Sequence, residues 1–280
     1  MTPVLLHDFM VEEHVKNALK EDIGFGDITT DYLIPENKRI TAKLNTRQDG
    51  ILCGIDIVKT VFKILSDEVK IQTFFKDGDK IKKGDTLAVI EGTARAVLTG
   101  ERTALNYIQR LSGIATETNR YQEAVGNHKA RITDTRKTTP GFRMFEKYAV
   151  FTGGARLHRF NLSDCVMIKD NHIQFAGSIT NAVNKIRENL SHTHKIEIEC
   201  DTIEQVKEAV EAKADIIMLD NMNPDLMKQC VELINGRALV EASGNVTIET
   251  VKNIAATGVD IISSSAITAK AKTLDIALDM

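Results

Sequence analysis

The chain has 280 residues, with 36 Lys and Arg against 39 Asp and Glu, which gives a formal net charge of −3. Apolar residues make up 42% and charged residues 27%, a mixture that excludes a disordered or collagen-like chain. No apolar run approaches the length of about 18 residues that a membrane span needs, and MTPVLLHDFMVEEH turns acidic too early for a signal peptide. We therefore expect a cytoplasmic protein with no membrane partner. The slight negative charge also argues against nucleic acid, whose binders usually carry a basic face.

The first part of the chain, residues 1–115, is predicted to form a domain of its own. Val11, Val15 and Leu19 recur every four residues within 8–20, which predicts an amphipathic helix. From about residue 38 to 98 the pattern favours strands separated by glycine and aspartate turns. Residues 100–118 carry an apolar stripe with helical spacing and predict a second helix.

A different pattern occupies residues 116–269. Short β-branched runs alternate with helical stretches. The later runs repeat every 20–22 residues, which is roughly the minimum length for one strand, one helix and two loops. This alternation predicts a parallel sheet covered by helices. All six strands end in polar or charged residues, which favours a barrel, where every such end meets at one mouth, over an open sheet. A length of about 155 residues is short for eight units, so we expect an incomplete barrel of six or seven strands. We expect residues 270–280 to pack on the N-terminal domain.

Cationic side chains gather at the ends of the first predicted barrel strands and in the loops that follow. Arginine suits the bidentate binding of carboxylates and phosphates, whereas lysine acts as a point charge. A solvated basic loop and a structural histidine are the plainer alternatives for these residues. The set comprises Arg136, Lys137, Arg143, His158, Arg159 and Lys169.

The later strand ends carry acids and small residues. Glu199 and Asp220 could bind Mg²⁺ or sugar hydroxyls, although Asp220 could equally cap a helix. Ser243-Gly244 and Ser263–Ser265 would let backbone N–H groups approach a phosphate, in the position where barrels commonly bind one. Together these residues predict a pocket for a substrate with several phosphates and a small carboxylate-bearing partner.

The sequence closely resembles the quinolinate phosphoribosyltransferase family. The resemblance extends from about Asp22 to Thr268 and is carried by motifs in the family's order. TDTRKTTPGFRMFEKYAV (133–150) together with IKDNH (168–172) is the most specific part. The other motifs are EDIGFGDITT (21–30), GERTALNYIQRLSGIAT (100–116), HR (158–159), IEIEC (196–200), LDN (219–221) and VEASGN (240–245).

The resemblance implies an enzyme that joins quinolinate to phosphoribosyl pyrophosphate with Mg²⁺, and that releases nicotinate mononucleotide, pyrophosphate and CO₂. It also implies an N-terminal α/β sandwich, an incomplete α/β barrel, and a homodimer or an assembly of dimers with shared active sites. The resemblance implies that the quinolinate carboxylates are bound by Arg136, His158, Arg159 and the neighbouring subunit's Arg102. It implies that Lys137 and Lys169 lie beside the reacting groups and the pyrophosphate, and that Glu199 and Asp220 serve the ribose hydroxyls and the metal. The 5-phosphate would be held by Ser243, Gly244, Ser263, Ser264 and Ser265.

Two other functions remain open at this stage. The same fold could use nicotinate as the acceptor, or belong to the related protein found with molybdate-transport systems. Three arginines and a histidine nevertheless suit two carboxylates better than one. A non-catalytic phosphate-binding or carrier protein would explain the hairpins and the small-residue cup, but it would leave Lys137, Lys169, Glu199 and Asp220 without a role.

Overall fold

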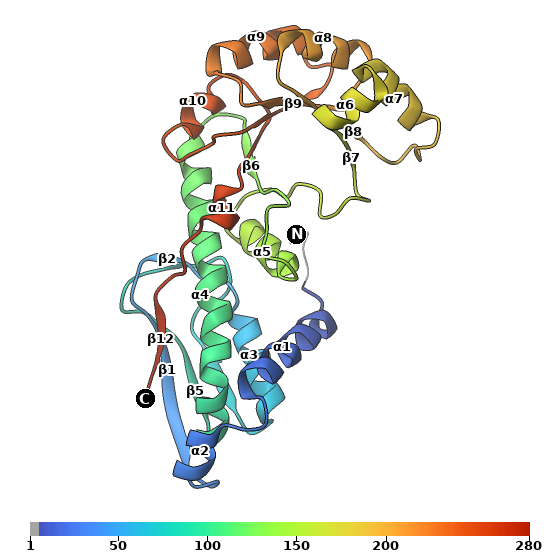
Figure 1. Ribbon diagram of the computed structural model, residues 1–280. Coiled ribbons are helices and arrows are strands. Elements are labelled where there is room, and N and C mark those ends of the chain that lie inside the picture. The colour runs from blue at the N-terminus through green and yellow to red at the C-terminus, as the bar shows by residue number, and fades with distance from the viewer. Residues whose placement is uncertain (1–5) are drawn as a thin grey trace. The chain divides into compact units, whose positions relative to one another are not determined.

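The computed structural model describes residues 6–280, and Figure 1 shows its helices and strands. The chain divides into two compact units. The N-terminal unit contains the chain up to Asn119 together with Met144–Gly154 and Ala271–Met280. The barrel unit contains Arg120–Arg143 and Ala155–Lys270. Over the described residues, no helix combines the length and the hydropathy that crossing a membrane requires.

The N-terminal unit is built on an antiparallel sheet of order β12-β1-β5-β3. The C-terminal residues complete this sheet, because β12 pairs with β1 over the register Lys43↔Asp279 to Thr46↔Ile276 (Figure 1). A separate pair joins β2 to β4. The strands are β1 (Arg39–Thr46), β2 (Gly50–Ile51), β3 (Lys70–Thr73), β4 (Lys80–Ile81), β5 (Thr86–Thr93) and β12 (Ile276–Asp279).

The helices of this unit include both predicted ones. Helix α1 buries Val11, Val15 and Leu19, as their spacing predicts. The helix predicted over 100–118 is part of a longer one of 32 residues, α4 (Ala94–Val125), because neither Gly100 nor Gly113 breaks it. The helices are α1 (Asp8–Ile23), α2 (Ile28–Leu33) and α3 (Ile55–Leu65), with most of α4. Helix α5 (Arg143–Thr152) belongs to this unit from Met144 onward.

A buried carboxylate fixes the start of α3. Asp77 accepts hydrogen bonds from the backbone N–H groups of Gly54 and Ile55 at 2.9 and 3.0 Å, and from the hydroxyl of Tyr148 at 2.7 Å. Burial raises the pKa of Asp77, although these hydrogen bonds act in the opposite direction. The carboxylate therefore caps the positive end of α3 and ties α5 to it.

The barrel unit contains one six-stranded parallel sheet of order β6-β11-β10-β9-β8-β7. Strands β6 and β7 form its two edges, so the structure confirms an incomplete barrel with six strands. The strands are β6 (Arg131–Thr133), β7 (Val166–Ile168), β8 (Ile196–Cys200), β9 (Ile216–Asp220), β10 (Leu239–Ser243) and β11 (Ile261–Ser263). The helices are α6 (Asp170–Ala176), α7 (Ile179–Arg187), α8 (Ile203–Glu211), α9 (Pro224–Ile234), α10 (Val251–Ala255) and α11 (Ala266–Ala269).

The strands of this sheet expose two chemically different faces. Successive side chains of a strand project to opposite sides, so in β8 the buried Ile196, Ile198 and Cys200 share one face. Glu197 and Glu199 share the other, which is the inside of the barrel. Figure 1 shows α6, α7, α8 and α9 covering the outside. The inside is therefore where polar residues of separate strands meet.

Candidate active site

A pocket of about 340 Å³, here called the mouth, lies at the carboxyl ends of the barrel strands. Nine of the residues selected from the sequence line it, together with Thr135, Met167 and Met218. The nine are Arg136, Lys137, His158, Arg159, Lys169, Glu199, Asp220, Ser243 and Ser263. Four side chains are cationic and two are carboxylates, so the mouth has a positive balance suited to anionic ligands.

Five selected residues do not line the mouth. Arg143 stands at the start of α5. Gly244, Ser264 and Ser265 follow strands that end there. Arg102 belongs to α4 in the N-terminal unit and lines a different hollow, which it shares with Asp22 and Asp27.

Two neighbouring arginines act on Arg136, which lines the mouth. Burial and the positive charges of Arg159 and Arg143 lower the pKa of Arg136. Arg143 is bound to the protein itself, since it donates to the Thr138 hydroxyl and the Phe160 carbonyl, each at 3.0 Å. Arg143 therefore braces the loop, whereas Arg136 and Arg159 supply the charge that an anion would neutralise.

Lys169 and Glu199 form an ion pair between β7 and β8. Lys169 also stands at the start of α6, where its backbone N–H donates to His172 Nδ1 at 3.0 Å. His172 thus fixes the backbone at the start of α6. The pair holds the lysine in the mouth, which Asp220 of β9 also lines.

Asp220 is oriented by two asparagines that the sequence analysis did not select. Asn221 donates from Nδ2 to Asp220 Oδ2 at 2.6 Å, and Asn245 donates to Asn221 Oδ1 at 3.0 Å. Asn221 adopts a left-handed backbone with φ 54°, which asparagine tolerates better than most residues. Both asparagines could have been found from the sequence, because the LDN and SGN segments each place an asparagine within two residues of the end of a strand.

Gly244 makes room for this arrangement. Its φ is 87°, and a Cβ there would come within 2.2 Å of Asn221 Oδ1 and 2.9 Å of the Asn221 nitrogen. The structure therefore explains the glycine by the close approach of Asn221. Its predicted contact with a phosphate stays a prediction.

The three serines after β11 differ in their surroundings. Ser263 is buried at the mouth, and its hydroxyl has no hydrogen-bond partner within residues 6–280. Ser264 accepts the N–H of Ala266 at 3.2 Å, and Ser265 precedes α11 without a side-chain cap. Ser263 is therefore the serine whose hydroxyl is available to a ligand at the mouth.

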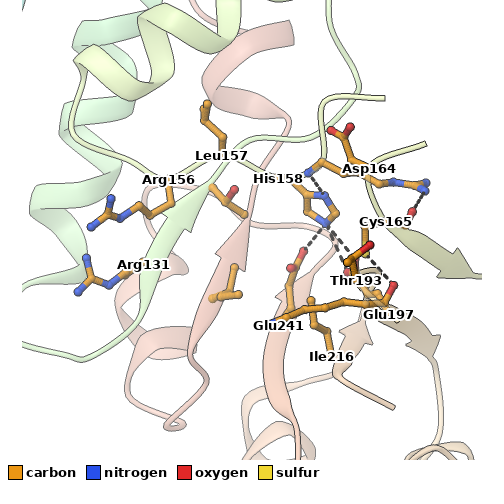
Figure 2. Close-up of a pocket in the computed structure, with 14 residues that line it drawn as sticks. Arg131, Arg156, Leu157, His158, Asp164, Cys165, Thr193, Glu197, Ile216 and Glu241 are labelled. Carbon is orange, nitrogen blue, oxygen red and sulfur yellow. Dashed lines mark hydrogen bonds and ion pairs between the residues drawn. The ribbon is translucent and has the colours of Figure 1, made fainter. Parts of the chain in front are cut away.

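His158 has both ring nitrogens engaged inside the protein. Nε2 lies 3.3 Å from Glu197 and 3.5 Å from Glu241, and Nδ1 accepts the backbone N–H of Arg159 at 2.7 Å (Figure 2). Burial lowers the pKa of His158 and the two carboxylates raise it, while the Arg159 N–H directed at Nδ1 opposes a second ring proton. Burial raises the pKa of Glu197. The sequence analysis missed Glu197 and Glu241, although a glutamate inside an apolar strand is a recognisable signal.

The family models for quinolinate phosphoribosyl transferase match both parts of this chain, the N-terminal domain over residues 27–112 and the C-terminal domain over 114–279. The chain belongs to the quinolinate phosphoribosyltransferase family. It is 44% identical over 275 residues to the probable carboxylating nicotinate-nucleotide pyrophosphorylase of Bacillus subtilis, an alignment that covers 98% of this chain and 95% of that one. The chloroplastic enzyme of Arabidopsis thaliana is 43% identical, over 94% of this chain and 81% of that one.

Solved structures agree with this membership. NadC from Streptococcus pyogenes superposes with a TM-score of 0.96 at 39% identity, over 99% of this chain and 98% of that one. The human nicotinic acid phosphoribosyltransferase reaches a TM-score of 0.61 at 11% identity, over 98% of this chain and 74% of that one, so it shares the fold alone.

Replacement of Gly244 by alanine should separate catalysis from backbone strain. We expect Gly244→Ala to displace Asn221, and with it Asp220, and to lower kcat of the folded enzyme by about tenfold or more. Gly258→Ala is the matched control, because Gly258 also has a left-handed φ of 92° but adjoins Val231 rather than the mouth. Both variants should lose about 1 kcal/mol of stability, measured by urea denaturation. Equal activity in the two folded variants would contradict the role assigned to Gly244.

Proposed function

We propose that the barrel unit transfers the phosphoribosyl group of phosphoribosyl pyrophosphate to quinolinate, with loss of CO₂. The products are nicotinate mononucleotide and pyrophosphate. Family membership supports this reaction. The observation that carries it is the mouth itself, where four cationic side chains and two carboxylates surround a pocket large enough for two small anions.

The chemistry needs little covalent help from the protein. The pyridine nitrogen attacks the anomeric carbon as pyrophosphate leaves, through a transition state with oxocarbenium character. Positioning and electrostatic stabilisation therefore dominate. In decarboxylation, the electron pair of the broken bond stays on the ring carbon beside the cationic nitrogen, which acts as the sink. That carbon then takes up a proton, so no general base is required.

We assign the acceptor to the arginine side of the mouth. Arg136 and Arg159 would bind the carboxylates of quinolinate, and Lys137 and Lys169 would stabilise the negative charge that develops on pyrophosphate. Asp220 and Ser243, which are register partners on β9 and β10, would face the ribose and its phosphate. Ser263, Ser264 and Ser265 complete the predicted phosphate site.

The two carboxylates suit Mg²⁺, a hard cation that proteins usually hold through one or two carboxylates and the phosphates of the substrate. Lys169 occupies Oε2 of Glu199, and Asn221 occupies Oδ2 of Asp220. The second oxygen of each accepts no hydrogen bond from residues 6–280, and these oxygens would hold the ion. When bound, Mg²⁺ would neutralise charge on the departing pyrophosphate.

Arg102 would serve the active site of a neighbouring subunit, in a homodimer or an assembly of dimers. It lies on α4 of the N-terminal unit, whereas the residues that line the mouth belong to the barrel unit. An isologous interface would let each subunit supply the same arginine to the other. The cytoplasmic location stays a prediction from the sequence.

Nicotinate is the competing acceptor. It has a single carboxylate, whereas Arg136 and Arg159 already supply two guanidinium groups at the mouth. The similarity to the human nicotinic acid enzyme extends to the fold alone at 11% identity. The quinolinate reaction is therefore better supported.

The first functional prediction concerns the reaction itself. Purified protein should consume quinolinate with equal release of CO₂ and pyrophosphate, because phosphoribosyl transfer and decarboxylation are coupled. A metal chelator should abolish the reaction, and Mg²⁺ should restore it. Product analysis by chromatography and trapped CO₂ provides the measurement. Comparable turnover of nicotinate would show that the second carboxylate is not recognised and would contradict the assignment.

The second prediction concerns the shared site. Arg102→Ala and Lys169→Ala should each be inactive alone, but mixing them under conditions of subunit exchange should restore about a quarter of wild-type activity. About half the dimers are then mixed, and each mixed dimer has one barrel with both residues intact. The control is a mixture of Arg136→Ala and Lys169→Ala, which removes two residues of the same barrel. If exchange is confirmed by mass and the first mixture stays inactive, the site is not shared.

A further inference from the structure

His158, Glu197 and Glu241 form a buried cluster inside the barrel, one layer below the mouth. Their side chains are 10%, 1% and 3% exposed. Each glutamate lies two residues before a residue of the mouth, Glu197 before Glu199 and Glu241 before Ser243, and therefore points to the same inner face. Figure 2 shows the imidazole of His158 between the two carboxylates.

The two ring nitrogens of His158 have different hydrogen-bonding roles. The N–H of Arg159 points at Nδ1 from 2.7 Å, so Nδ1 must act as an acceptor. The ring proton therefore lies on Nε2 and is donated to Glu197 at 3.3 Å, while Glu241 Oε1 lies 3.5 Å from Nε2 with no hydrogen-bond partner among residues 6–280. Because Nε2 stays protonated in the neutral ring with this tautomer and in the charged ring alike, the cluster is not arranged to ligate a metal through that atom.

A second hollow lies behind this cluster. It has a volume of about 530 Å³ and is lined by His158, Arg159, Glu197, Glu241 and Thr133, among others. His158 and Arg159 thus separate this hollow from the mouth. Without partners for Nε2, the ring would have room to turn away from its present position.

The held ring in turn fixes Arg159. Its Nδ1 binds the Arg159 backbone, and the guanidinium of Arg159 donates from Nη1 to the Cys165 carbonyl at 2.9 Å. The backbone N–H of His158 donates to Asp134 Oδ1 at 2.8 Å, which anchors the same segment from the β6 side. Arg159 is thereby held at the mouth beside Arg136, close enough for each charge to affect the other.

We propose that Glu197 and Glu241 are positioning residues for the acceptor site: they hold His158, which fixes the backbone of Arg159 and so the guanidinium that binds a substrate carboxylate. This role rests on the proposed function. It also accounts for two carboxylates in a buried layer, where apolar side chains of similar size would cost less to bury. His158 then acts from behind Arg159 rather than by a hydrogen bond of its own to the substrate.

Steady-state kinetics of Glu241 variants test this role. Glu241→Leu removes the carboxylate 3.5 Å from Nε2 and should raise KM for quinolinate about tenfold, with KM for phosphoribosyl pyrophosphate changed less than about twofold. Glu241→Gln keeps an acceptor oxygen of the same length and should retain most of the wild-type KM. Thr133→Val is the matched control, because Thr133 is also buried, lines the same hollow, and has a hydroxyl without a hydrogen-bond partner among residues 6–280.

Two kinetic results would overturn the proposal. One is a wild-type quinolinate KM in Glu241→Leu. The other is an equal rise of both KM values with a matching loss of melting temperature, which would indicate a general structural role. Should Glu241→Leu fail to fold, the same comparison is made with Glu241→Met, which also removes the carboxylate but keeps a flexible side chain of similar length.

Nitrogen NMR of His158 separates this proposal from the proposed reaction. In the wild-type protein, Nε2 should be protonated and Nδ1 should couple to the Arg159 amide. A ring protonated at Nδ1 alone would overturn the positioning role, whatever the enzyme's substrate. If the NMR result holds while wild-type protein fails to consume quinolinate, the proposed reaction is wrong and the assignment of Arg159 to a quinolinate carboxylate falls with it.

Discussion

The two-residue period of the barrel strands is the constraint on which the rest of the site depends. Every second side chain of a strand faces the inside, so six parallel strands stack their inward residues in layers. The upper layer contains Lys169, Glu199, Asp220, Ser243 and Ser263, which line the mouth. Two residues earlier in each strand stand Met167, Glu197, Met218, Glu241 and Ile261, of which Met167 and Met218 also line the mouth and Glu197 and Glu241 lie below it. Chemistry and support are therefore set by the same backbone geometry.

Charge follows the same layering. The arginines come from loops above the strand ends, where no regular structure limits their approach to one another. Burial and repulsion within this group lower the pKa of Arg136, and a bound dicarboxylate would relieve the repulsion. The lower layer contributes the opposite sign, since Glu197 and Glu241 lie beneath the arginines. Burial raises the pKa of Glu197, and the positive charge of Arg159 acts in the opposite direction, which links the two layers electrostatically.

Much of this architecture could be predicted from the sequence. The alternation of β-branched and helical segments predicted the incomplete barrel, and polar strand ends predicted Lys169, Glu199 and Asp220 at one mouth. Residues that act through others were harder to find. Glu197 and Glu241 lie inside strands rather than at their ends, and Asn221 orients Asp220 only through a left-handed turn.

Other features depend on contacts between residues that are distant in the sequence, and these contacts cannot be deduced from a single sequence. Arg143 carries the same charge as Arg136, yet its hydrogen bonds to Thr138 and Phe160 make it a brace. Gly244 was expected to admit a phosphate, whereas the close neighbour in the structure is Asn221. In both cases the residue type limits which roles are possible, and the neighbours in the folded structure decide which role the residue has.

A crystal structure of the enzyme with quinolinate bound tests the layered site most directly. The account predicts that the carboxylates lie about 3 Å from guanidinium or ammonium groups of the mouth, with Arg159 among the donors. It also predicts that His158 keeps Nδ1 on the Arg159 amide and Nε2 toward Glu197 and Glu241. Quinolinate bound in the hollow behind the cluster, or His158 turned to hydrogen-bond a substrate carboxylate, would contradict it.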